Sequence, residues 1–340
     1  MQAQPTERHA DPQVPIASAH TTIYDELRAD QFRMLCLSPV ADCNDPIHVD
    51  LETYDDNNCP EYKFTSYAWG GEDGDSSLQS PVYVDEYWDV LLQTKNCWSL
   101  LQYLRPRRGI RLVWLDAICI DQSNTRERDA QVVKMGDIYR NCSRVVVYLG
   151  KDVAQIVSDT SERSTIPRRF SLDEVVDKFT DASIDPQKLF QLQYFTRVWI
   201  IQELLLPPGA IIPLNSFEFL VTRLTPGRLE AKWQAKQAKE LGSESISDWD
   251  STGAPWFQYA AGGADEIEQG IWGILQHTWS SHTSDARDKI FGVLGLIDTK
   301  EGATENATRN RGELQSATPT PNVNYSISNV HIFLEYLAIS

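Results

Sequence analysis

The chain has 340 residues, of which 41% are hydrophobic and 23% are charged, an ordinary composition for a globular protein with a large core. Its formal net charge is −17 and no block of basic residues occurs, so its electrostatic field would repel nucleic acids and anionic membranes. No apolar stretch approaches the roughly 20 residues that span a bilayer, and the polar N-terminus does not resemble a signal peptide. We therefore expect neither a nucleic-acid partner nor a membrane span, whereas an anionic small molecule could still bind in a local pocket.

The six cysteines are scattered through a long chain and several lie in apolar or helical contexts, which is typical of free thiols in a reducing compartment. We therefore expect a cytoplasmic protein. Cys43, His48 and Cys59 do not have the spacing of a compact zinc site, and no fourth ligand is evident. No metal site is expected.

The first part of the chain predicts a tail followed by short strands. Residues 1–21 are polar, lack periodicity and predict a disordered tail. Alternating apolar residues then predict strands at 32–37, 47–51, 62–67 and 82–84. Apolar residues at Cys97, Leu100, Leu101 and Leu104 have helical spacing and predict a helix over 94–104.

The clearest unit is a strand over 111–116, a helix over 124–140 and a continuous apolar strand over 144–149. A strand, helix and strand in this order predict a βαβ crossover, which joins parallel strands of a sheet covered on both faces. We therefore predict an α/β fold with a central, mainly parallel sheet flanked by helices. Extra strands precede this core and extra helices follow it.

The second half of the chain is more polar and more irregular. Helices are predicted at 172–179, 194–205, within 225–255, at 267–279 and at 285–296. Residues 299–322 are rich in Glu, Asn, Thr and Pro and predict a disordered insertion, and 323–340 predict the start of a further helical segment that a longer protein could continue.

Three tryptophan-bearing motifs are too specific to be generic strands or helices. They are TSYAWG at 65–70, WLDAICIDQ at 114–122 and FTRVWIIQE at 195–203. Together and in this order they resemble the motifs of the fungal heterokaryon-incompatibility (HET) domain. The resemblance extends over roughly residues 24–298, and we predict a HET domain over 22–298. The segments 96–105 and 284–289 also resemble family motifs, with Cys97 and Ala286 as mild departures.

The resemblance implies a role in non-self recognition (allorecognition) and regulated cell death, a fungal form of innate immunity. HET domains are distantly similar to Toll/interleukin-1 receptor (TIR) domains, which implies a flavodoxin-like core. Some TIR domains cleave NAD with a helical glutamate that follows a tryptophan. Trp199 and Glu203 are four residues apart, as in that WxxxE pattern, and would share one helical face.

The candidate site follows from this resemblance and from the fold. Glu203 is the candidate catalytic residue, because a carboxylate can stabilise the positive charge that develops when an N-glycosidic bond breaks. Asp116 would lie at the carboxyl end of a parallel strand, where open α/β sheets bind ligands. The other candidate ligand-binding residues are Tyr67, Trp69, Asp121, Gln122 and Trp199.

Each residue also has a structural interpretation. Trp69, Trp114 and Trp199 could serve as core or lid packing, and Glu203 could pair with Arg197. Asp121 and Gln122 precede a helix and could cap it. Three hypotheses therefore stay open. In the first, the chain is an effector that hydrolyses NAD or a related nucleotide and has no bound cofactor. In the second, it is a non-catalytic signalling module that self-associates or binds a protein partner. In the third, it is a degraded relative without activity.

Overall fold

The computed structural model describes residues 23–39, 42, 45–154, 168–172, 189–214, 217–222, 224–241, 252–257, 270–296 and 323–332. The predicted disordered segments 1–21 and 299–322, and residues 173–179 of one predicted helix, lie outside the described residues.

Among the described residues, the first half of the chain, up to the end of α4, forms seven strands and four helices. They are β1 (Gln31–Leu37), β2 (His48–Asp55), β3 (Lys63–Tyr67), β4 (Ser80–Val84), β5 (Asp89–Gln93), α1 (Lys95–Leu104), β6 (Arg111–Trp114), α2 (Asp116–Cys119), α3 (Thr125–Asn141), β7 (Arg144–Tyr148) and the short α4 (Lys151–Ala154). The predicted helices at 94–104 and 124–140 are confirmed within one residue at each end.

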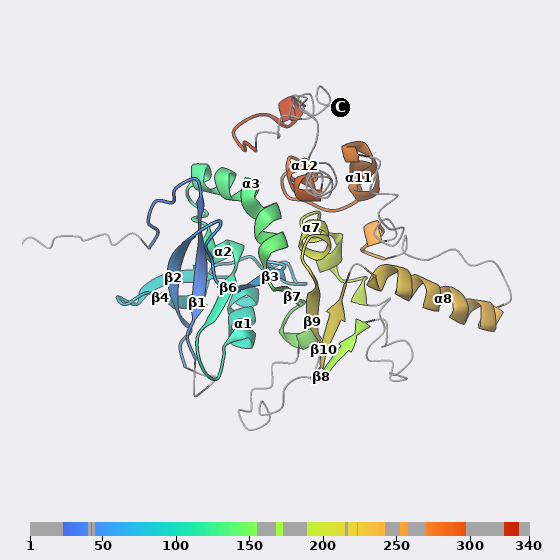
Figure 1. The fold of residues 1–340 in the computed structure, drawn as a ribbon, viewed down its shortest axis with the longest axis horizontal. Coiled ribbons are helices and arrows are strands. Elements are labelled where there is room, and N and C mark those ends of the chain that lie inside the picture. The colour runs from blue at the N-terminus through green and yellow to red at the C-terminus, as the bar shows by residue number, and fades with distance from the viewer. Residues whose placement is uncertain are drawn as a thin grey trace, which may run out of the picture.

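The second half adds three strands and a group of helices (Figure 1). They are β8 (Arg168–Ser171), the 3-10 helix η3 (Gln193–Thr196), α7 (Ile200–Leu205), β9 (Ala210–Leu214), β10 (Phe217–Val221), α8 (Thr225–Leu241), α11 (Gly270–Thr278), α12 (Asp288–Phe291) and the 3-10 helix η5 (Leu294–Leu296).

All described strands join one sheet in the order β5-β4-β2-β1-β6-β3-β7-β9-β10-β8. The four central strands β6, β3, β7 and β9 are parallel, and they have the same relative order as the first four strands of a flavodoxin-like sheet. Antiparallel pairs extend this core on both sides, at β1 with β2 and β6, at β4 with β5 and at β9 with β10. The predicted α/β fold with a mainly parallel central sheet is confirmed.

Helices cover the central strands on both faces, as the predicted βαβ unit requires. On one side α1 packs with α4, and on the other side α3 packs with α7 and η5. Figure 1 shows α11 and α12 in the upper part of the view, above α7. The β6-α3-β7 crossover passes over β3, which lies between the two strands.

The core is built on the central strands. The Trp114 ring is fully buried and stacks on Phe64, with 5.0 Å between the ring centroids, and the Tyr139 ring of α3 meets the other edge of Phe64. Of the three motif tryptophans, Trp114 is therefore core packing. Trp69 and Trp199 are half-buried.

Two predicted helices are interrupted by tertiary contacts. The predicted helix 194–205 divides into η3 and α7, because the backbone at Arg197 and Val198 pairs with His282 instead of continuing the helix. The predicted helix 285–296 divides into α12 and η5 around Gly292. A Cβ atom at Gly292 would lie 2.8 Å from the Asp288 carbonyl oxygen, so this close approach needs glycine.

Candidate functional site

A cavity of about 800 Å³ opens at the carboxyl ends of β3 and β6. Its walls come from the segment after β3, from α2 and α3, from η3 and α7, and from segments near α12 and Tyr325. The lining residues that bear polar or aromatic groups include Trp69, Asp116, Gln122, Arg128, Arg197, Trp199, Glu203, His282, Asp285, Asp288 and Tyr325. Parallel α/β sheets commonly bind ligands at this end of their strands.

Glu203 lies in α7 and its side chain reaches the cavity although the residue is only 7% exposed. The Ser66 hydroxyl of β3 donates a hydrogen bond to Glu203 Oε2, and the Tyr194 hydroxyl contacts the same Ser66 oxygen. Burial raises the pKa of Glu203 to about 7, against the opposing effects of Arg197 and the Ser66 hydrogen bond. A carboxylate with this pKa can change its protonation state near neutral pH.

Asp116 is the first residue of α2, and Leu115 alone separates it from the end of β6. Its Oδ2 accepts a hydrogen bond of 3.0 Å from Trp69 Nε1, and its Oδ1 accepts one of 2.8 Å from the backbone N–H of Ala117. Burial raises the pKa of Asp116, and the Trp69 hydrogen bond and the Arg197 charge oppose this rise. The Trp69 indole is therefore oriented by a cavity carboxylate.

Arg197 is a cation close enough to influence both carboxylates. Its Nη1 donates a hydrogen bond of 2.7 Å to the Tyr67 carbonyl oxygen, and its charge lowers the pKa of both Glu203 and Asp116. Sequence reasoning treated Arg197 only as an ion-pair partner of Glu203. Its place in the third motif, two residues before Trp199, was the available signal that it belongs to the site.

The other predicted ligand-binding residues divide into two groups. Gln122 and Trp199 line the cavity, and Gln122 Nε2 donates a hydrogen bond of 2.8 Å to the Asp116 carbonyl oxygen. Tyr67 and Asp121 are not among the lining residues. The Tyr67 ring is 3% exposed in the core, and the Asp121 carboxylate accepts hydrogen bonds from the backbone and hydroxyl of Ser123.

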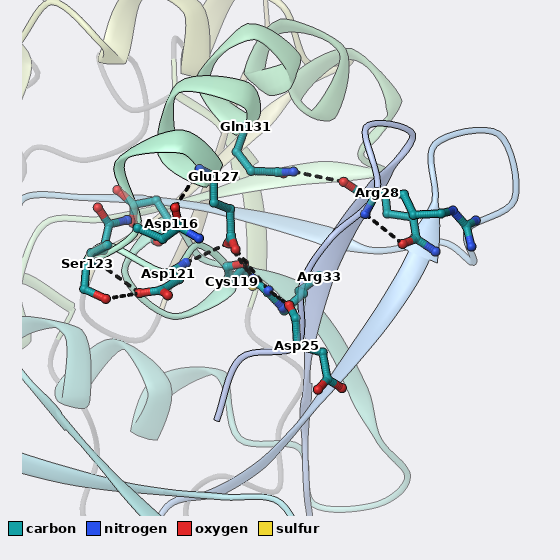
Figure 2. A network of polar contacts seen from close by, with 12 residues as sticks. Asp25, Arg28, Arg33, Asp116, Cys119, Asp121, Ser123, Glu127 and Gln131 are labelled. Carbon is teal, nitrogen blue, oxygen red and sulfur yellow. Dashed lines mark hydrogen bonds and ion pairs between the residues drawn. The ribbon is translucent and has the colours of Figure 1, made fainter. Parts of the chain in front are cut away.

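A buried ion pair holds the loop that follows α2 (Figure 2). Arg33 of β1 meets Glu127 of α3 at 2.5 Å, and these side chains are 2% and 7% exposed. Glu127 Oε1 also accepts a hydrogen bond of 2.8 Å from the Asp121 backbone N–H, and Arg33 donates to the carbonyl oxygen of Cys119. The side chains of Arg33 on β1 and Glu127 on α3 therefore hold the loop that contains Gln122.

Glu127 lies three residues after Asn124, the spacing of a capping box, but its carboxylate has another role. The Asn124 side chain caps α3 by accepting a hydrogen bond from the Glu127 backbone N–H, as a capping box requires. The Glu127 carboxylate, however, pairs with Arg33. The need to neutralise a buried guanidinium outweighs the weaker reciprocal cap.

The wall near α12 was missed by sequence reasoning. The Asp288 carboxylate accepts hydrogen bonds from the hydroxyls of Tyr325 and Thr283, and burial raises its pKa. The Tyr325 ring lies 4.9 Å from the Arg128 guanidinium carbon and 5.2 Å from that of Arg287. These residues are distant in sequence, so no local pattern indicates that they meet.

The cavity is lined by charges of both signs, with an excess of carboxylates. Four lining residues are carboxylates, namely Asp116, Glu203, Asp285 and Asp288, and two are arginines, namely Arg128 and Arg197. Buried carboxylates stabilise positive charge that develops during a reaction more strongly than they would in water.

Among the described residues, no three His, Cys, Asp or Glu side chains gather in an arrangement that could hold a metal ion. Within the same part of the chain, no helix is long and apolar enough to cross a membrane. Cys43, one of the three residues considered for a zinc site, lies outside the described residues.

Comparison with known proteins gives consistent matches. Residues 62–203 match the family model described as heterokaryon incompatibility protein (HET). The chain is 31% identical over 128 residues to heterokaryon incompatibility protein 6, OR allele, of Neurospora crassa, which is 36% of this chain and 19% of that protein. It is 26% identical over 187 residues to vegetative incompatibility protein HET-E-1 of Podospora anserina, which is 51% of this chain and 12% of that protein. No solved structure matches.

The fold and the cavity define an α/β protein with a ligand-sized site at the carboxyl ends of parallel strands. With the family match and both relatives in agreement, residues 62–203 form a HET domain. The matched region contains the three tryptophan motifs and ends at Glu203. The chain spans only a fifth or less of the length of these two relatives.

Proposed function

We propose that the chain acts in fungal non-self recognition and regulated cell death, and that its cavity hydrolyses NAD or a related nucleotide. The observation that carries the enzymatic proposal is the Glu203 carboxylate, which is buried, held by Ser66 and yet lines the cavity. Burying a carboxylate lowers the stability of the fold, and carboxylates with perturbed pKa values concentrate at functional sites.

The chemistry follows from the charge of the substrate and of the site. The bond between the ribose C1′ and the nicotinamide nitrogen breaks, and neutral nicotinamide leaves with the bonding electron pair. The ionised Glu203 carboxylate stabilises the oxocarbenium-like ribose. A water molecule then adds to C1′ and releases a proton. Trp69 and Trp199 provide aromatic surfaces for the base or ribose, and Asp116 and Gln122 provide hydrogen-bonding groups.

The test measures nicotinamide release from NAD by the wild-type chain, by Glu203→Gln and by Asp121→Asn. We expect Glu203→Gln to lower the rate at least about 100-fold, as loss of a group that stabilises transition-state charge does. Asp121→Asn should keep the wild-type rate, because Asp121 does not line the cavity. No release by concentrated wild-type protein would contradict the enzymatic proposal, and equal release by Glu203→Gln would move the catalytic role to another residue.

A non-catalytic signalling module that binds a protein partner or itself is the alternative, and an exposed apolar hairpin favours it. Five large apolar side chains at residues 78–92 are exposed to solvent.

We also propose a cytoplasmic location, which the free thiols of Cys36, Cys59, Cys97, Cys119 and Cys142 support.

A further inference from the structure

Exposed apolar side chains concentrate on the hairpin of β4 and β5. Ten large apolar side chains are exposed among the described residues, and half of them lie within residues 78–92. These five are Leu78, Tyr87, Trp88, Val90 and Leu92. The other exposed ones, such as Val133, lie far apart in the sequence. A concentration of this kind marks an interaction surface more often than scattered exposed residues do.

Strand β5 is an edge strand of the sheet. It pairs with β4 on one side, and no other described strand pairs with its outer side. Val90 and Leu92 alternate with the less exposed Leu91 and Gln93, and they lie opposite Tyr83 and Pro81 of β4. The outer edge therefore offers a row of backbone hydrogen-bonding groups beside an apolar face, as strands that accept a further strand do.

The turn of this hairpin is held in a strained conformation. Trp88 has a φ of 55°, which is unusual for a bulky side chain, and Asp85 has a φ of 56°. His48 Nε2 lies 2.9 Å from the Asp85 carbonyl oxygen, and the Leu51 backbone N–H donates a 2.9 Å hydrogen bond to the Asp85 carboxylate. The Trp88 ring packs 4.8 Å from the His48 ring. Trp88 is therefore held in place although half of it is exposed.

The charges around the hairpin indicate what kind of partner fits. The hairpin, residues 80–93, contains no Lys or Arg. It contains three acidic residues: Asp85, Glu86 and Asp89. A second copy of the chain would bring the same excess of negative charge to the contact, whereas a basic partner would be attracted.

We propose that β5 binds an extended partner segment with alternating apolar and basic residues, which adds to the sheet as a further edge strand. The backbone of the segment pairs with the outer side of β5. Its apolar side chains pack on Val90, Leu92 and Trp88, and its basic side chains meet the acidic residues of the hairpin. This surface is separate from the cavity, and the proposal holds whether or not the cavity is catalytic.

The first experiment uses a capped nine-residue peptide that alternates valine and lysine. Its control is a peptide of the same composition with the valines and lysines grouped in two blocks, which keeps the charge but not the pattern. We expect the alternating peptide to bind at least tenfold more tightly at physiological salt. Its binding should also slow amide hydrogen exchange in Asp89–Gln93. Equal binding of both peptides, or no binding of either, would overturn the proposal.

The second experiment uses Val90→Thr with Val133→Thr as its matched control. Both valines are exposed, and the exchange preserves side-chain shape and net charge, so folding should be unaffected. Val90→Thr should weaken binding of the alternating peptide several-fold, and Val133→Thr should not change it. Equal affinities of the two variants would contradict a site on β5. Concentration-dependent self-association that Val90→Thr abolishes, without peptide binding, would identify a second copy as the occupant instead and overturn the proposal.

Discussion

Glu203 combines a stability cost with the catalytic role that we propose for it. The Ser66 hydroxyl donates a hydrogen bond to its carboxylate and Arg197 is a nearby cation, but neither compensates fully for its removal from water. The result is a pKa of about 7. The ionised form, which the proposed reaction needs, is therefore the form that destabilises the folded state.

The first prediction concerns the pH dependence of stability. Because the folded-state pKa of Glu203 is raised from 4.5 to about 7, its protonated form stabilises the fold fully below about pH 4.5 and this stabilisation is lost as the pH rises through 7. Glu203→Gln should remove this loss. We expect the variant to gain up to about 3 kcal/mol over the wild type between pH 4 and pH 8.

Urea denaturation of both proteins at several pH values measures this difference. A pH-independent difference between wild type and Glu203→Gln would show that the Glu203 pKa is ordinary. If both the pH dependence and nicotinamide release behave as expected, the same ionisation should appear in the rate, which should increase with pH up to about 7.

At the scale of single residues, the sequence motifs predicted part of the candidate site. Glu203, Asp116, Gln122, Trp69 and Trp199 all line the cavity. Tyr67 and Asp121 belong to the same motifs but do not line it, because neighbouring residues in a strand or turn point in different directions. Resemblance to a motif identifies a segment, whereas the direction of each side chain depends on packing that the sequence does not display.

At the scale of elements, the ion pair between Arg33 and Glu127 connects the N-terminal strand β1 to helix α3 and to the loop after α2 (Figure 2). Both side chains are almost fully buried, and both oxygens of the carboxylate contact the guanidinium. A pair of this kind adds little stability compared with apolar residues, but removing one partner leaves a buried charge without compensation.

The second prediction follows from this asymmetry. Glu127→Gln should destabilise the fold by about 3 to 5 kcal/mol, because Arg33 stays buried and charged. Asp137→Asn is the matched control on the same helix, since Asp137 is 74% exposed in its ion pair with Arg140 and should cost less than about 1 kcal/mol. Urea denaturation compares the free energies of unfolding of the two variants. Similar midpoints would show that loss of the buried pair does not destabilise the fold more than loss of the exposed pair.

The third prediction concerns the contact between α3 and η5. A Cβ atom at Gly136 would lie 3.1 Å from the Gly295 Cα, so the two backbones touch. Gly136→Ala should push these elements apart and cost about 1 to 3 kcal/mol, although alanine favours a helix. Thermal denaturation should show a lower midpoint. An unchanged or higher midpoint would mean that helix propensity outweighs the tight contact.

Local periodicity predicted the long helices and the βαβ unit, because their apolar stripes face a core that is near in sequence. It did not predict β9 and β10. Pro213 lies inside β9, and proline normally counts against a strand, but β9 is buried between β7 and β10. The division of the 194–205 helix was also missed, because its cause is pairing with His282, which is 85 residues after Arg197 in the chain.

At the scale of the whole molecule, the cavity draws its walls from nearly the full length of the described chain, from Ala68 to Tyr325. The family match ends at residue 203. The wall that contains Asp285, Asp288 and Tyr325 therefore lies outside the matched region. No local sequence pattern could place it, because Tyr325 and its partners Arg128 and Asp288 meet only in the folded chain.

The last prediction tests whether Tyr325 holds this wall in place. Its ring contacts Phe291, Arg128 and Arg287, and its hydroxyl donates a hydrogen bond to Asp288. Tyr325→Ala should lower the free energy of unfolding by about 2 to 3 kcal/mol, less than the 3 to 5 for a fully buried aromatic. It should also speed amide exchange in α12. Tyr87→Ala is the control, because Tyr87 is 70% exposed and should leave both measurements unchanged. If Tyr325→Ala behaves like this control, the segment around Tyr325 does not stabilise the cavity wall, and the site would be built by the family-matched region and α12 alone.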